Sequence, residues 1–288
     1  MREMGSILVR YAEMGLKSRS VRKRFESILV DNLMSSLANA GLEGLITTEY
    51  GRIFVEVEDP VRASRALSRV FGVSSVSSVI RCPGEMEEMK RKIADFSKPL
   101  LKEGQSFAVR ARRTGDHPFT SMDLGRELGS AVFLANEEKG VKVDLTDPDV
   151  EVFAEVRERR AYLFSAYIPG PGGLPLGSQG KVVVLLEQER DALAAWLIMK
   201  RGCRAIALGQ EDSAAAKLLR AWDPTLKVSS AMDLAEALKR HKALAAVFGY
   251  TLEDFEKIKE VNLPVPAFFP LVGMDYKEIE ERLERIRA

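Results

Sequence analysis

Two arginine-rich stretches are the parts of this sequence best suited to chemistry, because guanidinium groups bind phosphate. In the first, Arg110-Ala111-Arg112-Arg113, alternation along an expected strand puts Arg110 and Arg112 on one face. Thr120 and Ser121 follow at an expected helix start, where hydroxyls and free backbone N–H groups add to a phosphate-binding surface. The alternative for these arginines is a cross-strand ion-pair network.

The second stretch is a cluster of cations at the start of an expected helix. It holds five basic residues with no acid between them, Lys17, Arg19, Arg22, Lys23 and Arg24. Cations at a helix N-terminus oppose the helix dipole, so an anionic partner would relieve that unfavourable interaction. The arrangement favours contact with phosphate groups, and the alternative is a solvated helix face.

A third candidate is the segment directly after the expected buried strand 182–186, where a nucleotide-binding domain places a glycine-rich phosphate loop. This segment consists of Glu187, Gln188, Glu189, Arg190 and Asp191. Backbone amides wrap a phosphate only where the loop can take glycine-like conformations and let the anion approach. Because the segment has no glycine and two glutamates, the sequence predicts that pyrophosphate is repelled and that nucleotide binding is lost.

The elements expected before residue 169 form two modules of strands and helices. Strands near 6–11, 45–50, 52–58 and 73–80, with helices from Ser18 and Pro60, follow the β-α-β-β-α-β order of a ferredoxin-like domain. After a linker at Cys82-Pro83-Gly84, a mixed α/β module is expected. Its elements are a helix over 85–101, a strand over 107–112, a helix that Thr120 caps, and three strands over 141–145, 150–156 and 161–168.

The last part of the chain has a different pattern, after a Gly/Pro-rich hinge over residues 170–180. Short apolar runs alternate with helical segments, which implies a parallel sheet covered on both faces. The runs are 182–186, 205–208, 226–228, 243–248 and 265–268. The sequence therefore predicts a doubly wound, Rossmann-like domain. The expected boundaries are 1–82, 83–169, 170–180 for the hinge, and 181–288.

Composition narrows the classes of function. The chain has 288 residues, of which 46% are hydrophobic and 30% charged, as in ordinary globular proteins. It has no apolar run near the ~20 residues of a membrane span and no signal-peptide core, so we expect a cytoplasmic protein without a membrane partner.

Two cysteines and two histidines argue against a metal site. Cys82 could be exposed in its linker, whereas Cys203 is expected to be buried. A net charge of +1 means that a nucleic acid would have to be met by local patches.

Several motifs resemble those of the 4-thiouridine tRNA sulfurtransferases, enzymes also associated with thiamine biosynthesis. Residues 11–19, Tyr-Ala-Glu-Met-Gly-Leu-Lys-Ser-Arg, are similar to the family's N-terminal ferredoxin-like motif. The runs similar to the THUMP domain are 110–113, 120–129, 143–149 and 155–157. The hinge, with Gly170-Pro171-Gly172-Gly173, is similar to the junction between the THUMP domain and the family's PP-loop ATPase domain. The resemblance covers roughly residues 6 to 208.

The resemblance implies tRNA binding, with the acceptor stem and the 3′ CCA end held by the first two domains. The residues expected at the RNA are Lys17, Arg19, Arg22, Lys23, Arg24, Arg110, Arg112, Arg113, Thr120, Ser121 and Arg126. In the family, the PP-loop domain adenylates a uridine for sulfur insertion. Of the family's Ser-Gly-Gly-x-Asp-Ser loop, this sequence retains only Asp191, and no sulfur-carrying cysteine can be placed.

We therefore predict a tRNA-binding THUMP protein with a degenerate PP-loop domain and without catalytic residues, metal or cofactor. The first alternative is a divergent tRNA sulfurtransferase, which would use ATP and Mg²⁺. The second is an adaptor that presents tRNA to a separate modification enzyme. A homodimer is possible, and the sequence does not give the oligomeric state.

Overall fold

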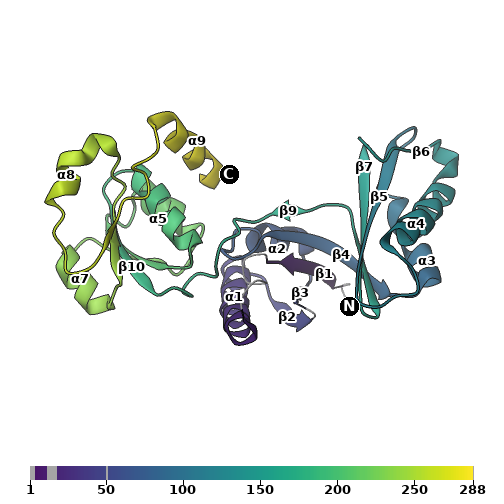
Figure 1. Ribbon diagram of the computed structural model, residues 1–288, viewed down its shortest axis with the longest axis horizontal. Helices are drawn as coiled ribbons and strands as arrows, with labels where there is room; N and C mark the ends of the chain where they lie inside the picture. Colours follow the sequence, from purple (N-terminus) through teal and green to yellow (C-terminus); the bar gives the residue numbers. More distant parts are fainter. Residues whose placement is uncertain (1–3, 12–17, 50, 288) are drawn as a thin grey trace. The chain divides into compact units, whose positions relative to one another are not determined.

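The computed structural model describes residues 4–11, 18–49 and 51–287 (Figure 1). Residue contacts divide the chain into two compact units. The first comprises Met1–Val9, Glu43–Ser64 and Val76–Ile168, and the second comprises Arg10–Leu42, Arg65–Ser75 and Pro169–Ala288. Lys17, one of the cations expected at RNA, lies outside the described residues.

A continuous mixed sheet runs through the first part of the chain, in the order β2-β3-β1-β4-β8-β7-β5-β6, with β9 paired to β4. Its strands are β1 (Gly5–Arg10), β2 (Gly44–Glu49), β3 (Arg52–Val57), β4 (Ser75–Pro83), β5 (Ser106–Thr114), β6 (Lys142–Val143), β7 (Val150–Arg157), β8 (Arg160–Phe164) and β9 (Ile168–Pro169). With α1 (Arg19–Asn39) and α2 (Pro60–Leu67), the chain order β1-α1-β2-β3-α2-β4 confirms the predicted ferredoxin-like module.

The segment predicted to be a linker is instead part of β4. Cys82 and Pro83 pair antiparallel with Ala161 and Arg160 of β8, so backbone hydrogen bonding continues from the first module into the second. Cys82 is 6% exposed, and burial raises the pKa of its thiol to about 11. The expectation of an exposed Cys82 is therefore wrong, because sheet pairing covers a position that looks like a loop from its Pro-Gly neighbours.

Two helices cover one face of β5, β7 and β8, namely α3 (Met86–Ser97) and α4 (Ser121–Ala135), followed by the 3₁₀ turn η2 (Glu137–Lys139) (Figure 1). Ile93, Leu124 and Leu128 from the helices pack with Val152 and Ala154 from β7 in one apolar core. Strand alternation leaves every second side chain of β5 and β7 on the face away from these helices. Arg110 and Arg112 of β5 lie on that face, because Phe107, Val109 and Ala111 point toward the helices.

The last part of the chain forms a five-stranded sheet in the order β12-β11-β10-β13-β14, with each neighbouring pair parallel. Its strands are β10 (Lys181–Leu186), β11 (Arg204–Gly209), β12 (Lys227–Ser229), β13 (Ala245–Val247) and β14 (Ala267–Phe268). Its helices are α5 (Arg190–Lys200), α6 (Ala214–Arg220), α7 (Leu234–His241), the 3₁₀ turn η3 (Leu252–Asp254), α8 (Phe255–Glu260) and α9 (Tyr276–Arg287). The predicted doubly wound fold is confirmed.

Strand β10 is central in this sheet and is buried from both sides. Val182 and Val184 belong to the apolar core that also holds residues of α5, α6 and α9, whereas Val183 packs with Ala237 and Leu238 of α7. Figure 1 shows α5 and α9 on one side of β10 and α7 on the other. A strand covered on both faces needs a continuous apolar run, which is the pattern that β10 has.

The Gly/Pro hinge is hydrogen-bonded along its length within the second compact unit. The N–H of Gly172 donates to the carbonyl of Val73, and the N–H of Leu174 donates to the carbonyl of Lys200. Between them, Gly173 has a φ of 76°, and a Cβ atom there would come within 2.0 Å of the Lys200 carbonyl oxygen. The hinge is thus held in one conformation that requires glycine at position 173.

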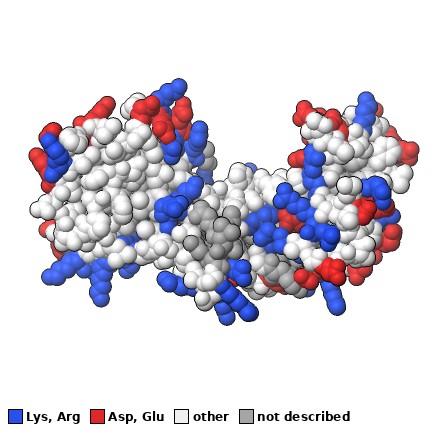
Figure 2. Space-filling model, viewed as in Figure 1, with Lys and Arg blue, Asp and Glu red and all other residues white. Residues whose placement is uncertain are grey.

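Charged side chains of both signs are interspersed over the α3–β8 part of the surface, and much of the visible face of the C-terminal sheet domain is uncharged (Figure 2). The two signs nearly balance over the whole sequence, whose net charge is +1. Any polyanion would have to be bound by local groups of cations.

Candidate nucleic-acid interface and nucleotide loop

The start of α1 is a group of cations without local acids. Arg19, Lys23 and Arg24 are exposed and Arg22 is half-buried, while the opposite side of the helix buries Phe25, Leu29, Leu33 and Leu37. The first turn has no acidic residue, and the side chain of the N-cap residue Ser18 makes no capping hydrogen bond. Within the described part of the chain, the N-terminal N–H groups and these cations are therefore available to an anion.

On β5, one arginine of the stretch 110–113 forms the cross-strand ion pair that was the alternative to phosphate binding. Arg110 Nε lies 2.6 Å from Oε1 of Glu151 on the neighbouring strand β7. Arg112 and Arg113 are exposed, and the Arg113 guanidinium donates to the Gly115 carbonyl at 3.2 Å. The Arg112 side chain has no hydrogen-bond or ion-pair partner among the residues that the structure describes. Arg112 is thus the cation of this stretch most available to phosphate.

The carboxylate that pairs with Arg110 was not among the residues selected from the sequence. Alternation along 150–156 would have found it, because Val152 and Ala154 face the helical core and Glu151 therefore shares the other face with the β5 arginines. Only the parallel register of β5 and β7 shows which glutamate meets which arginine.

The predicted N-cap at Thr120 is confirmed as a capping box. The Thr120 hydroxyl accepts from the backbone N–H of Asp123 at 3.1 Å and donates to Oδ2 of Asp123 at 2.8 Å. The Thr120 hydroxyl and backbone N–H together lower the pKa of the Asp123 carboxyl. The Ser121 hydroxyl has no such partner within the described part of the chain, and the nearby Arg126 is exposed and lies 3.6 Å from Asp123. Ser121 is therefore freer to bind a ligand than Thr120.

The loop after β10 is closed by a carboxylate of its own. Oδ2 of Asp191 accepts hydrogen bonds from the backbone N–H groups of Glu187, at 2.8 Å, and Gln188, at 2.7 Å. Asp191 is 6% exposed, and burial raises the pKa of its carboxyl. The backbone donors that a bound anion would use are thus already satisfied from within the chain.

Two other charged residues of this loop, Glu189 and Arg190, are held by ion pairs. Glu189 lies 2.6 Å from Arg287 of α9, and Arg190 lies 2.7 Å from Asp254 of η3. The N–H of Thr251 also donates to Asp254 at 3.0 Å, in a capping box. The Thr251-x-x-Asp254 spacing is a readable signal for a helix start, but its contact with the loop arises only from the packing of η3 beside α5.

Residues 4–11, 18–49 and 51–287 contain no group of three or more His, Cys, Asp or Glu side chains placed to hold a metal ion. None of the helices in those ranges is long and apolar enough to span a membrane.

Comparison with known proteins identifies the modules. Residues 6–77 match the ThiI ferredoxin-like domain, and residues 84–166 match the THUMP domain. A probable tRNA sulfurtransferase of Methanothermobacter thermautotrophicus is 33% identical over 334 residues, covering 97% of this chain and 84% of that protein. The chain belongs to the tRNA sulfurtransferase family.

Other members of the tRNA sulfurtransferase family match a shorter region at higher identity. The probable tRNA sulfurtransferase of Methanosarcina acetivorans is 46% identical over 200 residues, which is 68% of this chain and 48% of that relative. The chain thus spans about half the length of several curated relatives that it matches. The alignment with the M. thermautotrophicus protein is longer, at 334 positions, than the 288 residues of this chain, so dozens of positions of that relative have no counterpart here.

Solved structures show the same fold as this tRNA sulfurtransferase homologue. The crystal structure of PH1313 from Pyrococcus horikoshii Ot3 matches with a TM-score of 0.82 and 29% identity, over 99% of this chain and 100% of that chain. A crystal structure of a 4-thiouridine synthetase–RNA complex with bound ATP matches with a TM-score of 0.75 and 22% identity, over 99% of this chain and 85% of that chain. The arrangement of strands and helices is therefore that of the family.

Proposed function

We propose that this member of the tRNA sulfurtransferase family binds tRNA through its ferredoxin-like and THUMP domains and does not adenylate it. The proposed absence of adenylation rests on the hydrogen bonds that the Asp191 side chain accepts. Its carboxylate takes the two backbone N–H groups with which the loop after β10 would otherwise hold a phosphate.

The proposed RNA binding is supported by cations that have no acidic partner among the residues that the structure describes. Arg112 on β5 and Arg19, Lys23 and Arg24 at the start of α1 are exposed. Side chains of this kind bind the RNA backbone, so they give affinity and selection of shape more than readout of sequence. We further propose that the acceptor stem and the 3′ CCA end are the parts of tRNA bound, with Ser121 beside the CCA end.

The loss of adenylation is supported by electrostatics and by space. A pyrophosphate group would have to displace the Asp191 carboxylate from two hydrogen bonds and would meet the exposed Glu187 beside it.

One observation favours a second candidate, an active tRNA sulfurtransferase. A relative named as a probable tRNA sulfurtransferase is 33% identical over 97% of this chain, so the similarity extends into the C-terminal domain. In that case ATP and Mg²⁺ would be required, and the Asp191 carboxylate would have to leave the two N–H groups when ATP binds.

Two measurements on the purified full chain separate these functions. The first is tRNA binding by mobility shift at low and moderate salt, where we expect binding that weakens steeply as salt rises. The second is ATP-dependent pyrophosphate release with and without tRNA, where we expect none. Release of pyrophosphate that depends on tRNA would support the sulfurtransferase instead. If tRNA binds and a modification enzyme co-purifies, the protein is an adaptor.

A further inference from the structure

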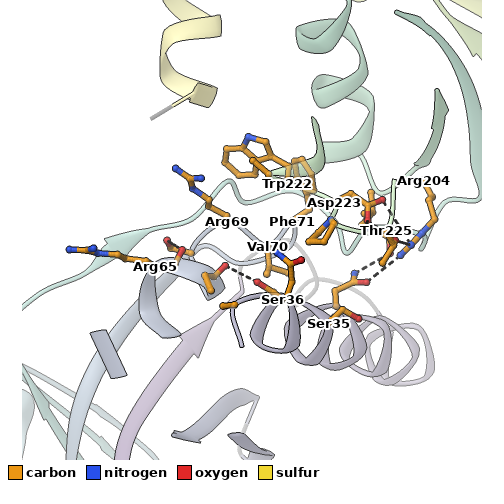
Figure 3. A pocket seen from close by; sticks show the side chains of 18 residues that line it. Ser35, Ser36, Arg65, Arg69, Val70, Phe71, Arg204, Trp222, Asp223 and Thr225 are labelled. Carbon is orange, nitrogen blue, oxygen red and sulfur yellow. Dashed lines mark hydrogen bonds and ion pairs between the residues drawn. The ribbon is translucent and has the colours of Figure 1, made fainter. Parts of the chain in front are cut away.

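A cavity of about 660 Å³ lies within the second compact unit and plays no part in the functions proposed above (Figure 3). Five segments line it: the second half of α1, the end of α2 with the following turn, the hinge, the start of β11, and the loop between α6 and β12. Its size is in the range of small-molecule sites, which is about 300–1,000 Å³.

The cavity is distinct from the loop after β10, because the two lie at opposite ends of the parallel strands of the C-terminal sheet. Arg204, which lines the cavity, begins β11 and pairs with Lys181, the first residue of β10. Glu187 and Asp191 follow the last residue of the same strand. A ligand in the cavity would therefore bind at the N-terminal ends of the parallel strands, away from the family's nucleotide loop at their C-terminal ends.

Three arginines and one acid line the cavity, so its charge is positive. Asp223 is balanced locally, because Thr225 donates to its Oδ1 through both N–H and hydroxyl and Arg204 lies 4.0 Å from its Oδ2. Arg65 and Arg69 line another side of the cavity, and their side chains extend away from Ser35, Asp223 and Arg204 (Figure 3). The guanidinium of Arg65 is exposed and has no partner among the described residues. The guanidinium of Arg65 therefore suits an anion such as phosphate.

The cavity lining also includes the half-buried aromatic side chain of Trp222, against which the buried Phe71 packs (Figure 3). The indole Nε1 of Trp222 donates to the carbonyl of Ile286 at 2.9 Å, and its ring centroid lies 5.5 Å from that of Phe71. The indole is thus fixed by a hydrogen bond and by packing before any ligand binds. A fixed aromatic surface beside an uncompensated arginine is suited to a ligand with both a flat ring and an anionic group.

We propose that this cavity binds a nucleoside monophosphate, with the phosphate at Arg65 and the base against Trp222. Inorganic phosphate would contact only Arg65, and an unphosphorylated nucleoside would contact only Trp222. Both should therefore bind more weakly than the mononucleotide. This site is independent of the tRNA contacts proposed on β5, and its occupation joins α1 and α2 to the C-terminal domain.

The test titrates the full chain separately with 5′-AMP, 5′-UMP, inorganic phosphate and uridine. Calorimetry measures the affinity, and the fluorescence of the two tryptophans, one of which lines the cavity, reports occupancy. We expect saturable binding of a mononucleotide that Arg65→Ala weakens about tenfold, since a charged hydrogen bond contributes on that scale. Arg62→Ala is the matched control, because Arg62 is exposed on the same helix and does not line the cavity.

A second variant tests volume instead of charge. Asn39 is exposed at the end of α1 and lines the cavity, so Asn39→Trp should fill it and abolish mononucleotide binding while tRNA affinity is kept. The proposal is overturned if no mononucleotide saturates the protein at millimolar concentration, or if neither variant changes the affinity. It is also overturned if Asp191→Ala strengthens mononucleotide binding while Arg65→Ala leaves it unchanged, which would place the nucleotide at the loop after β10, whose N–H groups the alanine frees. A loss of tRNA affinity in Arg65→Ala without any mononucleotide binding would identify an RNA-backbone contact instead.

Discussion

Gly249 lies so close to Asp191 that a Cβ atom at position 249 would come within 2.0 Å of the Asp191 Oδ1 atom and 2.9 Å of its Cα atom. Gly249 follows β13, and Asp191 lies in the first turn of α5, so the contact joins two neighbouring strand ends of the C-terminal sheet. The absence of a side chain at position 249 thus allows the Asp191 carboxylate to reach the loop N–H groups.

Replacing Gly249 by alanine should therefore destabilise the C-terminal domain. Forcing a methyl group against a buried backbone typically lowers the free energy of unfolding by about 1–3 kcal/mol. Urea unfolding followed by tryptophan fluorescence would measure the change, since both tryptophans contribute to the core of this domain.

The control for this substitution is Gly129→Ala. Gly129 lies within α4, and a Cβ atom there would meet nothing within 4 Å. Alanine favours a helix over glycine by up to about 1 kcal/mol, so this variant should be as stable as the wild type or more stable. If the Gly249→Ala protein unfolds at the same urea concentration as the wild type, the close packing described above is wrong.

Asparagine and alanine at position 191 should have different effects. The amide oxygen of Asp191→Asn can still accept from Glu187 and Gln188, whereas Asp191→Ala leaves both N–H groups unpaired and should lower the free energy of unfolding by about 2 kcal/mol or more. Denaturant titrations of both variants, in parallel with the wild type, provide the measurement.

The pH dependence of Asp191→Asn follows from the raised pKa of the Asp191 carboxyl, which is due to burial. Because the folded-state pKa lies above the ordinary value of 3.8, the folded protein binds this proton more tightly than the unfolded chain does. The stability of the wild type relative to Asp191→Asn should therefore increase as pH falls through the folded-state pKa toward 3.8. A difference that stayed constant over that range would show that the carboxyl titrates normally.

Charge reversal at Arg112 should weaken tRNA binding. Arg112→Glu removes one phosphate contact and adds repulsion, so we expect affinity to fall about fivefold or more and the slope of log affinity against log salt to decrease by about 0.7–0.9. Mobility shifts over a salt series measure both quantities. Arg91→Glu changes the net charge equally on α3, where Arg91 is paired with Glu88. Equal losses for both variants would mean that only net charge matters and that β5 makes no contact.

The thiol of Cys82 should be unreactive in the folded protein. Its pKa is raised to about 11 by burial, so at about pH 8 very little thiolate is present. In a Cys203→Ser variant, which leaves Cys82 as the remaining thiol, alkylation should be slow in buffer and fast in denaturant. Labelling of the native variant as fast as that of the denatured one would contradict the pairing of β4 with β8.

The sequence by itself determined the order of elements and the class of each module. Periodicity showed where strands and helices lie, the Thr120 and Asp123 spacing predicted a helix start, and the five residues after β10 showed that no glycine loop is present. These features depend on neighbours within a few positions, so they can be read along the chain.

The tertiary structure alone decided which groups meet. Arg110 pairs with Glu151 because β5 and β7 are parallel and adjacent. Cys82 is buried because β4 continues through the Pro-Gly segment to pair with β8. The same holds for Asp191, whose carboxylate was visible in the sequence as the one retained residue of the family's loop. This carboxylate lies against Gly249 and accepts from the N–H groups of Glu187 and Gln188. Its contact with Gly249 depends on packing between strand ends that are far apart along the chain.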